Sequence, residues 1–336
     1  MKKTLIALAA VAATGAAFAQ SSVTLFGIVD LNIRNVRQGG DNLTSMHQDG
    51  IASSRLGFRG VEDLGGGMSA GFWLEGGLNP DTGTAGGFNF MRRSTVSLMG
   101  GFGEVRLGRD YTPTFWNHTV YDPFGTNGVG SSLNTFNNLG SGSGTNVRAD
   151  NAISYFSPNM GGFGVQVQYA FKENTATNAP NEYLGARLTY AAGPLSVALA
   201  TASEGATAGS VDSYKRTNFG GSYDFGVAKL LGQYTQGKFG ASKLNHYLLG
   251  VTAPVGPGNL KASYTRSDYN AAAGDNDASQ IAVGYDYNLS KRTALYGTFS
   301  RISNKNAGTF GLSPNAAAVT AGGNSTGIEF GVRHAF

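Results

Sequence analysis

The chain ends with the segment TGIEFGVRHAF, residues 326–336, in which apolar and polar side chains alternate without a break. Successive side chains of a β-strand point to opposite faces, so Ile328 and Phe330 share one face while Glu329 and Arg333 share the other. One face suits lipid and the other suits water. The same pattern recurs along the chain, and a repeated dyad of this kind is typical of a transmembrane β-barrel.

The amino-terminus has the features of a secretory signal. Lys2 and Lys3 precede a short apolar run over residues 5–13, and Ala17 and Ala19 give the small-x-small form of a cleavage site. The apolar run is too short for a spanning helix, which needs about 20 residues. We therefore expect residues 1–19 to be a cleaved signal peptide and residues 20–336 to form one barrel domain.

The composition excludes several classes of protein. The chain has no cysteine, which excludes a disulfide framework and a thiolate metal site. Its 51 glycines, 20 phenylalanines and 15 tyrosines suit many strands joined by tight turns, with aromatic girdles at the membrane surfaces. The formal charge of +4 falls to about +2 once Lys2 and Lys3 are removed (23 basic minus 21 acidic residues). The bulk charge therefore gives no reason to expect nucleic acid as a partner.

The alternation predicts sixteen strands, an even number that lets the last strand pair with the first and close an antiparallel barrel. The predicted strands are residues 23–36, 54–62, 68–79, 88–99, 103–111, 151–157, 163–172, 182–190, 195–201, 214–225, 227–236, 243–253, 259–268, 279–289, 293–302 and 326–336. The fold class is thus all-β. Short turns rich in Gly, Pro or Asn alternate with longer connections, and we expect the short turns to face the periplasm.

One connection, residues 112–150, is far longer than the others. Connections of this length without structure of their own are usually functional or disordered. It contains Phe115, Trp116, Tyr121 and Phe124, which would form an adhesive patch on an exposed loop. We therefore expect this loop to fold inward against the barrel wall, with an aromatic surface loop as the alternative.

The alternation also sorts the charged residues. On the first five predicted strands it places these basic and acidic side chains in the lumen: Arg34, Arg55, Arg59, Glu75, Arg93, Glu104, Arg106 and Asp110. Arg92 would point outward, near the rim or at a subunit contact. An arginine cluster facing a loop that carries Asp122 would create a transverse field across the lumen. The alternative for each arginine is a solvated charge, or an ion pair with Glu75 or Glu104.

An ordered set of motifs runs through the mature chain. These are SVTLFG at 22–27, SRLGFRGVEDLGGGM at 54–68, GRDYTP at 108–113, DPFG at 122–125, AISYFSP at 152–158 and the terminal HAF. In this set the chain resembles the general porins of β-proteobacterial outer membranes. The FMRR segment at 90–93 departs from their pattern, which more often has a single arginine beside a neutral residue. The departure leaves open whether Arg92 or Arg93 corresponds to the single arginine of those porins.

The resemblance implies a homotrimer of sixteen-stranded barrels in the cell outer membrane, each with its long third loop folded into the pore. It implies passive diffusion of small hydrophilic solutes and ions, often with anion preference, and recognition of Phe336 by the barrel-assembly machinery. Outer-membrane lipid and lipopolysaccharide are the expected surroundings. By matching positions, the resemblance places the constriction at Arg55, Arg59, Arg93 and Arg148, facing Asp110 and Asp122.

Other functions have weaker support in the sequence. A substrate-specific channel for sugars or organic anions remains an alternative because Trp73 and Trp116 would provide aromatic surface in the lumen. An outer-membrane hydrolase would need an exposed Ser-His pair, and no G-x-S-x-G motif is present; His246 is expected in the lumen without a serine partner. Asp275 and Asp277 offer oxygen ligands for calcium, but a hairpin turn explains them as well. We expect no enzyme activity, cofactor or metal.

Overall fold

The computed structural model describes residues 22–84, 89–172, 181–206 and 212–336, and the predicted signal segment lies outside these ranges. Its strands form a single antiparallel sheet of 17 strands. They are β1 (Ser22–Gln38), β2 (Asp41–Gln48), β3 (Arg55–Gly65), β4 (Met68–Gly77), β5 (Arg93–Gly100), β6 (Gly103–Tyr111), β7 (Arg148–Phe156), β8 (Phe163–Ala170), β9 (Tyr183–Ala192), β10 (Leu195–Glu204), β11 (Tyr214–Asp224), β12 (Lys229–Phe239), β13 (Ser242–Val255), β14 (Gly258–Tyr269), β15 (Ala278–Asn288), β16 (Thr293–Asn304) and β17 (Asn324–Ala335).

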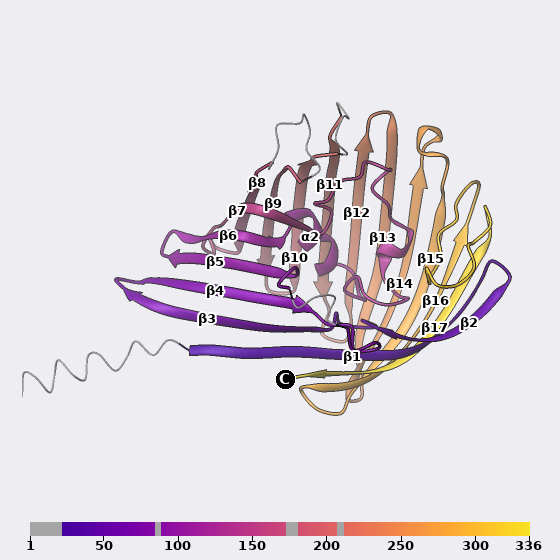
Figure 1. Cartoon of the computed structure of the whole chain (residues 1–336), viewed down its shortest axis with the longest axis horizontal. Helices are drawn as coiled ribbons and strands as arrows, with labels where there is room; N and C mark the ends of the chain where they lie inside the picture. The colour runs from indigo at the N-terminus through magenta and orange to yellow at the C-terminus, as the bar shows by residue number, and fades with distance from the viewer. Residues whose placement is uncertain (1–21, 85–88, 173–180, 207–211) are drawn as a thin grey trace, which may run out of the picture.

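The sheet closes because β17 returns to pair with β1 along residues 28–38. Figure 1 shows strands of the near wall, such as β3 to β6, crossing the direction of β10 to β13 behind them, as tilted strands of a barrel do in projection. Beyond the carboxy-terminal end of β17, Gly27 and Phe336 exchange two backbone hydrogen bonds of 3.1 and 3.0 Å. A side chain at Gly27 would collide with the Phe336 ring, so the terminal aromatic lies over the first strand.

The second barrel strand is interrupted, and here the prediction needs correction. Residues 37–53 were expected to be a loop, but Gly39 and Gly40 form a two-residue turn and β2 pairs with the far half of β1. Both glycines have positive φ, 59° and 89°, which a tight turn of this kind requires. β3 then pairs with the near half of β1. β2 and β3 lie end to end beside β1 and together take the place of one barrel strand. The 17 strands thus form sixteen staves, and the predicted sixteen-stranded barrel is confirmed.

The residues between β2 and β3 leave the sheet and turn into the barrel. The Asp30 carboxylate accepts backbone hydrogen bonds from Gly50, Ile51 and Ala52 at 3.2, 2.9 and 2.8 Å. Ser53 Oγ donates to Asn127 Oδ1 of the long loop at 3.1 Å. A buried carboxylate therefore holds the interruption in place and joins it to the loop.

The alternation of side chains agrees with a barrel that has lipid outside and water inside. Ile33 and Phe330 point outward and are 58% and 61% exposed, whereas the neighbouring Asp30 and Glu329 point inward and are buried. β1 and β17 share one register, so each outward residue lies beside another outward residue. An apolar outer surface and a polar inner surface follow directly from the strand period of two.

The connections are short at one end of the barrel and mostly long at the other. The short ones are residues 66–67, 101–102, 157–162, 193–194, 225–228, 256–257 and 289–292, close to the predicted turns. At the opposite end, β12 and β13 depart from the pattern and are joined by residues 240–241 alone. Gly240 has φ of 54°, so the glycine permits a tight turn at this long-loop end.

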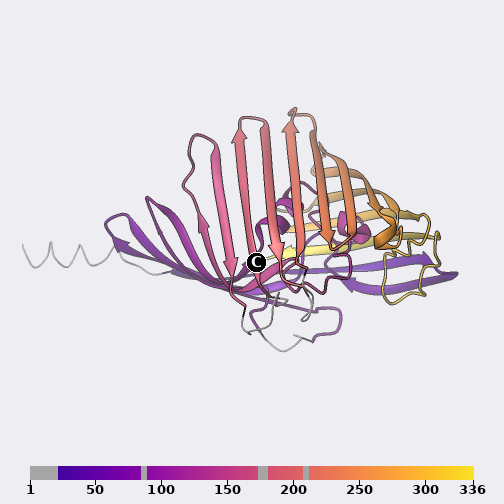
Figure 2. The ribbon, with the colours of Figure 1, turned by 90° about the horizontal axis from the view of Figure 1, so that it is seen from above.

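The connection between β6 and β7 lies inside the barrel, as Figures 1 and 2 show. It contains α2 (Pro113–Val120), which contacts β9, β10 and β11, and η2 (Ser132–Thr135), which contacts β14 and β15. Thr112 caps α2 by accepting from Phe115 N–H, and Pro113 occupies its first turn. Asn117 Nδ2 donates to Asn218 Oδ1 of the wall at 2.9 Å. None of the described helices is long and apolar enough to cross a membrane.

The predicted strand over residues 88–99 begins late, because regular pairing starts only at Arg93. Residues 89–92 precede the strand and do not follow its alternation. Arg92 N–H still donates to Glu75 O at 3.0 Å, so the backbone stays close to β4. This late start decides where the Arg92 side chain points.

Candidate functional site

The inner faces of β3 to β7 carry more positive than negative side chains. We call this set the arginine wall: Arg55, Arg59, Arg92, Arg93, Arg106 and Arg148, with Glu75, Glu104 and Asp110 among them. Its members come from strand starts and inward strand positions. Six guanidinium groups against three carboxylates leave an excess of three positive charges, counted on these nine residues.

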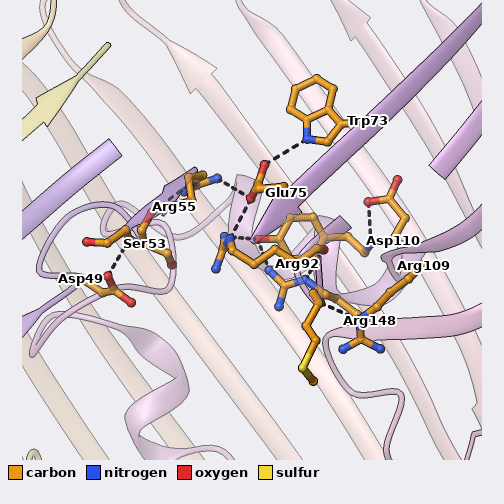
Figure 3. A network of polar contacts seen from close by, with 12 residues as sticks. Asp49, Ser53, Arg55, Trp73, Glu75, Arg92, Arg109, Asp110 and Arg148 are labelled. Carbon is orange, nitrogen blue, oxygen red and sulfur yellow. Dashed lines mark hydrogen bonds and ion pairs between the residues drawn. The ribbon is translucent and has the colours of Figure 1, made fainter. Parts of the chain in front are cut away.

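The half of the wall nearer the long loops is centred on Glu75 (Figure 3). Arg92 Nε lies 2.7 Å and Arg55 Nη1 lies 3.4 Å from Glu75 Oε1. Arg148 Nη2 donates to Tyr111 Oη at 2.8 Å, and its guanidinium lies 4.3 Å from the centre of the Tyr111 ring. Three guanidinium groups thus share one carboxylate and one phenol.

Arg92 does not point outward, which corrects the sequence prediction. Its guanidinium pairs with Glu75 and donates to Tyr111 Oη at 3.2 Å, inside the barrel. Its carbonyl accepts from Arg148 Nε at 2.7 Å. Because Arg92 lies before the first residue of β5, strand alternation does not govern its side chain. Both Arg92 and Arg93 therefore belong to the wall.

A second group within the wall contains Arg93 and Arg106. Arg106 binds both oxygens of Glu104 at 2.8 and 2.9 Å and one oxygen of Asp110 at 2.5 Å. Arg93 Nε lies 3.5 Å from the same Asp110 oxygen. Asp110 was expected to face the arginines across the lumen. It lies among them instead, because Asp110 shares the inner face of β6 with Glu104 and Arg106.

Arg59 is the exposed member of the wall. Its guanidinium carbon lies 5.3 Å from the centre of the Phe26 ring and 5.1 Å from that of Trp73. Across the described residues, no carboxylate comes within ion-pair distance of Arg59. Its charge is therefore held by aromatic faces and is not neutralised by an acid.

Asp122 does not face the arginines, which corrects a second prediction. Its carboxylate is buried within the long loop and accepts hydrogen bonds from Phe124 N at 2.8 Å, Ser132 N at 3.0 Å and Ser132 Oγ at 2.7 Å. Burial raises the pKa of this carboxyl, while the three donors favour its ionised form. Asp122 thus joins two parts of the loop and contributes nothing to the lumen surface.

Two buried carboxylates of the barrel accept hydrogen bonds from the long loop, and each also pairs with an arginine of a neighbouring strand. Glu329 accepts from Arg34 Nη2 at 2.8 Å and from Val129 N of the loop at 3.2 Å. On the other side, Glu204 accepts from Ser143 Oγ of the loop at 2.9 Å and pairs with Arg216 at 3.2 Å. Strand alternation predicted Arg34 in the lumen, but the pair of Glu204 on β10 and Arg216 on β11 was not predicted. Inward charged positions near the long-loop ends of adjacent strands are the signal that would have indicated it.

Two of the four histidines, His118 and His246, form a closed polar cluster and not an exposed catalytic pair. His118 Nε2 lies 3.0 Å from Ser132 Oγ, and His246 Nδ1 lies 2.9 Å from Ser267 Oγ, so the expectation that His246 has no serine partner was wrong. Both rings are buried. Ser132 lies between His118 and Asp122, whereas in a catalytic triad the histidine lies between the serine and the acid. Burial, His246 and Arg216 lower the pKa of the His118 imidazole well below its usual range.

The structure also places the candidate calcium ligands. Asp277 uses one carboxylate oxygen to accept from Tyr269 N at 2.8 Å and the other to accept from Asn306 Nδ2 at 3.1 Å. Asp277 therefore joins the end of β14 to the connection between β16 and β17. Within the described ranges, no group of three or more metal-ligating residues is found.

Comparisons with known proteins agree with this geometry. A family model described as Gram-negative porin matches residues 4–307. Outer membrane porin protein 32 of Delftia acidovorans is 48% identical over 354 aligned positions that cover 100% of both chains. An outer membrane porin protein of Bordetella pertussis is 32% identical, again over 100% of both. An anion-selective porin from Comamonas acidovorans has a solved structure with a TM-score of 0.88, at 45% identity over 94% of this chain and 100% of that one.

Proposed function

The chain belongs to the Gram-negative porin family, and from this membership we propose that it forms a water-filled outer-membrane channel that prefers anions. The channel passes small hydrophilic solutes and ions by passive diffusion. The observation that carries the anion preference is the arginine wall, with six guanidinium groups and three carboxylates on one side of the lumen.

The start of the long loop packs against Tyr111, to which Arg148 donates: the ring centres of Phe115 and Trp116 lie 5.0 and 5.3 Å from that of Tyr111. Ion pairs with Glu75, Glu104 and Asp110 compensate part of the wall, but Arg59 and Arg148 have no acidic partner within the described part of the chain. In a passage with little water, an uncompensated charge raises the local concentration of counter-ions. Arg55, Arg59, Arg93 and Arg148 thus remain the proposed selectivity residues, with Arg92 and Arg106 added to them.

The proposal extends to how the chain reaches and occupies the membrane. Residues 1–19 are a cleaved signal, and Phe336 is the residue that the barrel-assembly machinery reads. The mature chain is a homotrimer surrounded by outer-membrane lipid and lipopolysaccharide. Family membership supports these assignments, and the position of Phe336 at the end of the closing strand fits its part in assembly.

The reversal potential in a potassium chloride gradient tests the anion preference. A single channel in a planar bilayer should show preference for chloride over potassium at low salt. The preference should weaken as salt rises, because the Debye length falls from about 10 Å at 0.1 M to about 3 Å at 1 M. Cation preference of the wild-type channel at low salt would refute the proposal.

A further inference from the structure

A groove of about 380 Å³ is cut into the inner surface on the short-turn side of the arginine wall. Arg59, Arg93 and Arg106 line it, together with the apolar side chains of Val61 and Met99 and the ring of Trp73. Glu104 also lines the groove, but Arg106 binds both of its oxygens. The groove thus combines net positive charge with apolar surface, and its volume lies within the range of about 300–1,000 Å³ typical of small-molecule sites.

Arg59 differs from the other cations of the groove. Arg106 is committed to Glu104 and Asp110, and Arg93 lies 3.5 Å from Asp110. Over the residues that the structure describes, Arg59 has contacts with aromatic rings but no acidic partner. Its guanidinium N–H groups therefore remain available to an anion that enters the groove.

The aromatic rings position Arg59 before any ligand binds. Phe26 and Trp73 form an edge-to-face pair with ring centres 4.9 Å apart, and Trp73 Nε1 donates to Glu75 Oε2 at 3.1 Å. The Phe26 ring lies over Gly57, where an added Cβ would come within 2.5 Å of Phe26 Cζ. A fixed aromatic platform lowers the entropy lost when Arg59 binds an anion.

We propose that this groove is a binding subsite for small aromatic monocarboxylates. The carboxylate accepts hydrogen bonds from the Arg59 guanidinium, and the ring of the ligand lies against Val61, Met99 and Trp73. One carboxylate is sufficient, because Arg59 is the arginine of the groove without an acidic partner among the described residues. The proposal rests on the proposed function, because anions must enter the lumen to reach the groove.

Tryptophan fluorescence of the detergent-solubilised protein tests the subsite without requiring conduction. The chain has two tryptophans, so Trp116→Phe leaves Trp73 as the single reporter at the groove. Benzoate should change its emission saturably. Acetate lacks the ring and benzyl alcohol lacks the charge, so each should bind about tenfold more weakly, by the loss of apolar contact or of a charge-assisted hydrogen bond. Equal titration by benzoate and acetate would overturn the proposal.

Variants in the Trp116→Phe background separate the subsite from general electrostatics. Arg59→Gln should weaken benzoate about tenfold, and Arg59→Lys should recover part of the loss because it keeps the charge without the planar fork. The matched control is Arg266→Gln, which removes an arginine that is exposed at the long-loop end of β14. Equal benzoate affinity in Arg59→Gln and Arg266→Gln, with both proteins folded, would also overturn it. The reversal potential stands apart from this titration, so a failed subsite and a failed anion channel give different results.

Discussion

Arg92 and Arg93 are adjacent in the chain, yet both side chains enter the same lumen. Arg93 does so because it is the first inward residue of β5 and pairs with Asp110. Arg92 does so because it precedes the strand and is drawn to Glu75 and Tyr111. A doubled arginine at a strand start therefore adds a second charge to the lumen, where a neutral residue would add none.

Neutralising Arg92 should reduce anion preference as clearly as neutralising Arg93. A unit charge about 8 Å from the pore axis in water changes the energy of an ion there by about 0.5 kcal/mol, with opposite signs for chloride and potassium. Arg92→Gln and Arg93→Gln should therefore each lower the chloride-to-potassium permeability ratio about fivefold. The measurement is the reversal potential at low salt. Arg266→Gln, outside the lumen, should leave the ratio unchanged. An Arg92→Gln channel with wild-type selectivity would contradict the inward position.

At the scale of elements, the loop between β6 and β7 behaves as a fixed part of the barrel. Glu329 holds it through Val129, and Glu204 holds it through Ser143. Inside the loop, Asp122 joins the end of α2 to the start of η2 through Ser132. Displacing the loop would remove a hydrogen bond from each of these buried carboxylates, so these contacts resist displacement of the loop.

Removing the charge of Asp122 should loosen the loop without unfolding the barrel. Asp122→Asn replaces one of the two carboxylate oxygens by an NH₂ group, which places a donor against the donors of Ser132. The charge is also lost, and a hydrogen bond to a charged group contributes about 1.5–3 kcal/mol. Amide hydrogen exchange of residues 113–147 in detergent should therefore accelerate at least about tenfold, while exchange of the strands stays the same.

Asp275→Asn is the matched control for this loop experiment, because Asp275 is exposed in the turn after β14. It should leave exchange across residues 113–147 unchanged. If Asp122→Asn also leaves that exchange unchanged, the internal contacts of Asp122 do not stabilise the loop.

At the scale of the whole molecule, the barrel closes through its two ends. β1 contacts β17 on one side and β2 and β3 on the other, so the first strand completes the ring only when the last has been added. Phe336 extends this closure by its backbone exchange with Gly27. The side chains of the arginine wall point into the lumen, whereas the Phe336 ring lies over Gly27 on the outer face of β1.

Deleting Phe336 should therefore reduce assembly more than conduction. The amount of protein in the outer membrane should fall severalfold. The proposed trimer should give a heat-sensitive band of about three times the monomer mass on unheated detergent electrophoresis, and this band should weaken to the same extent. Channels that do insert should keep wild-type conductance and selectivity. Phe336→Tyr retains an aromatic carboxy-terminus and should assemble normally; unimpaired assembly of the deletion variant would count against the proposed recognition.

The sequence by itself determined the barrel and the sorting of most charges. The strand period of two fixes which side chains share a face, and this local rule needs no knowledge of the rest of the fold. It is enough to place Arg34, Glu75 and Arg106 inward and Ile328 and Phe330 outward. The rule holds only where residues are paired in a ladder, so it covers the strands and little else.

Only the tertiary structure decided the positions that lie outside the ladder. Arg92 precedes its strand, and Asp122 lies in a loop whose partners include Glu329, about 200 residues away from Val129 in sequence. The break between β2 and β3 depends on the carboxylate of Asp30 and its contacts with residues 50–52. Such positions are set by hydrogen bonds and ion pairs between distant segments, whose burial makes each unpaired group costly, and no periodicity in the sequence records them.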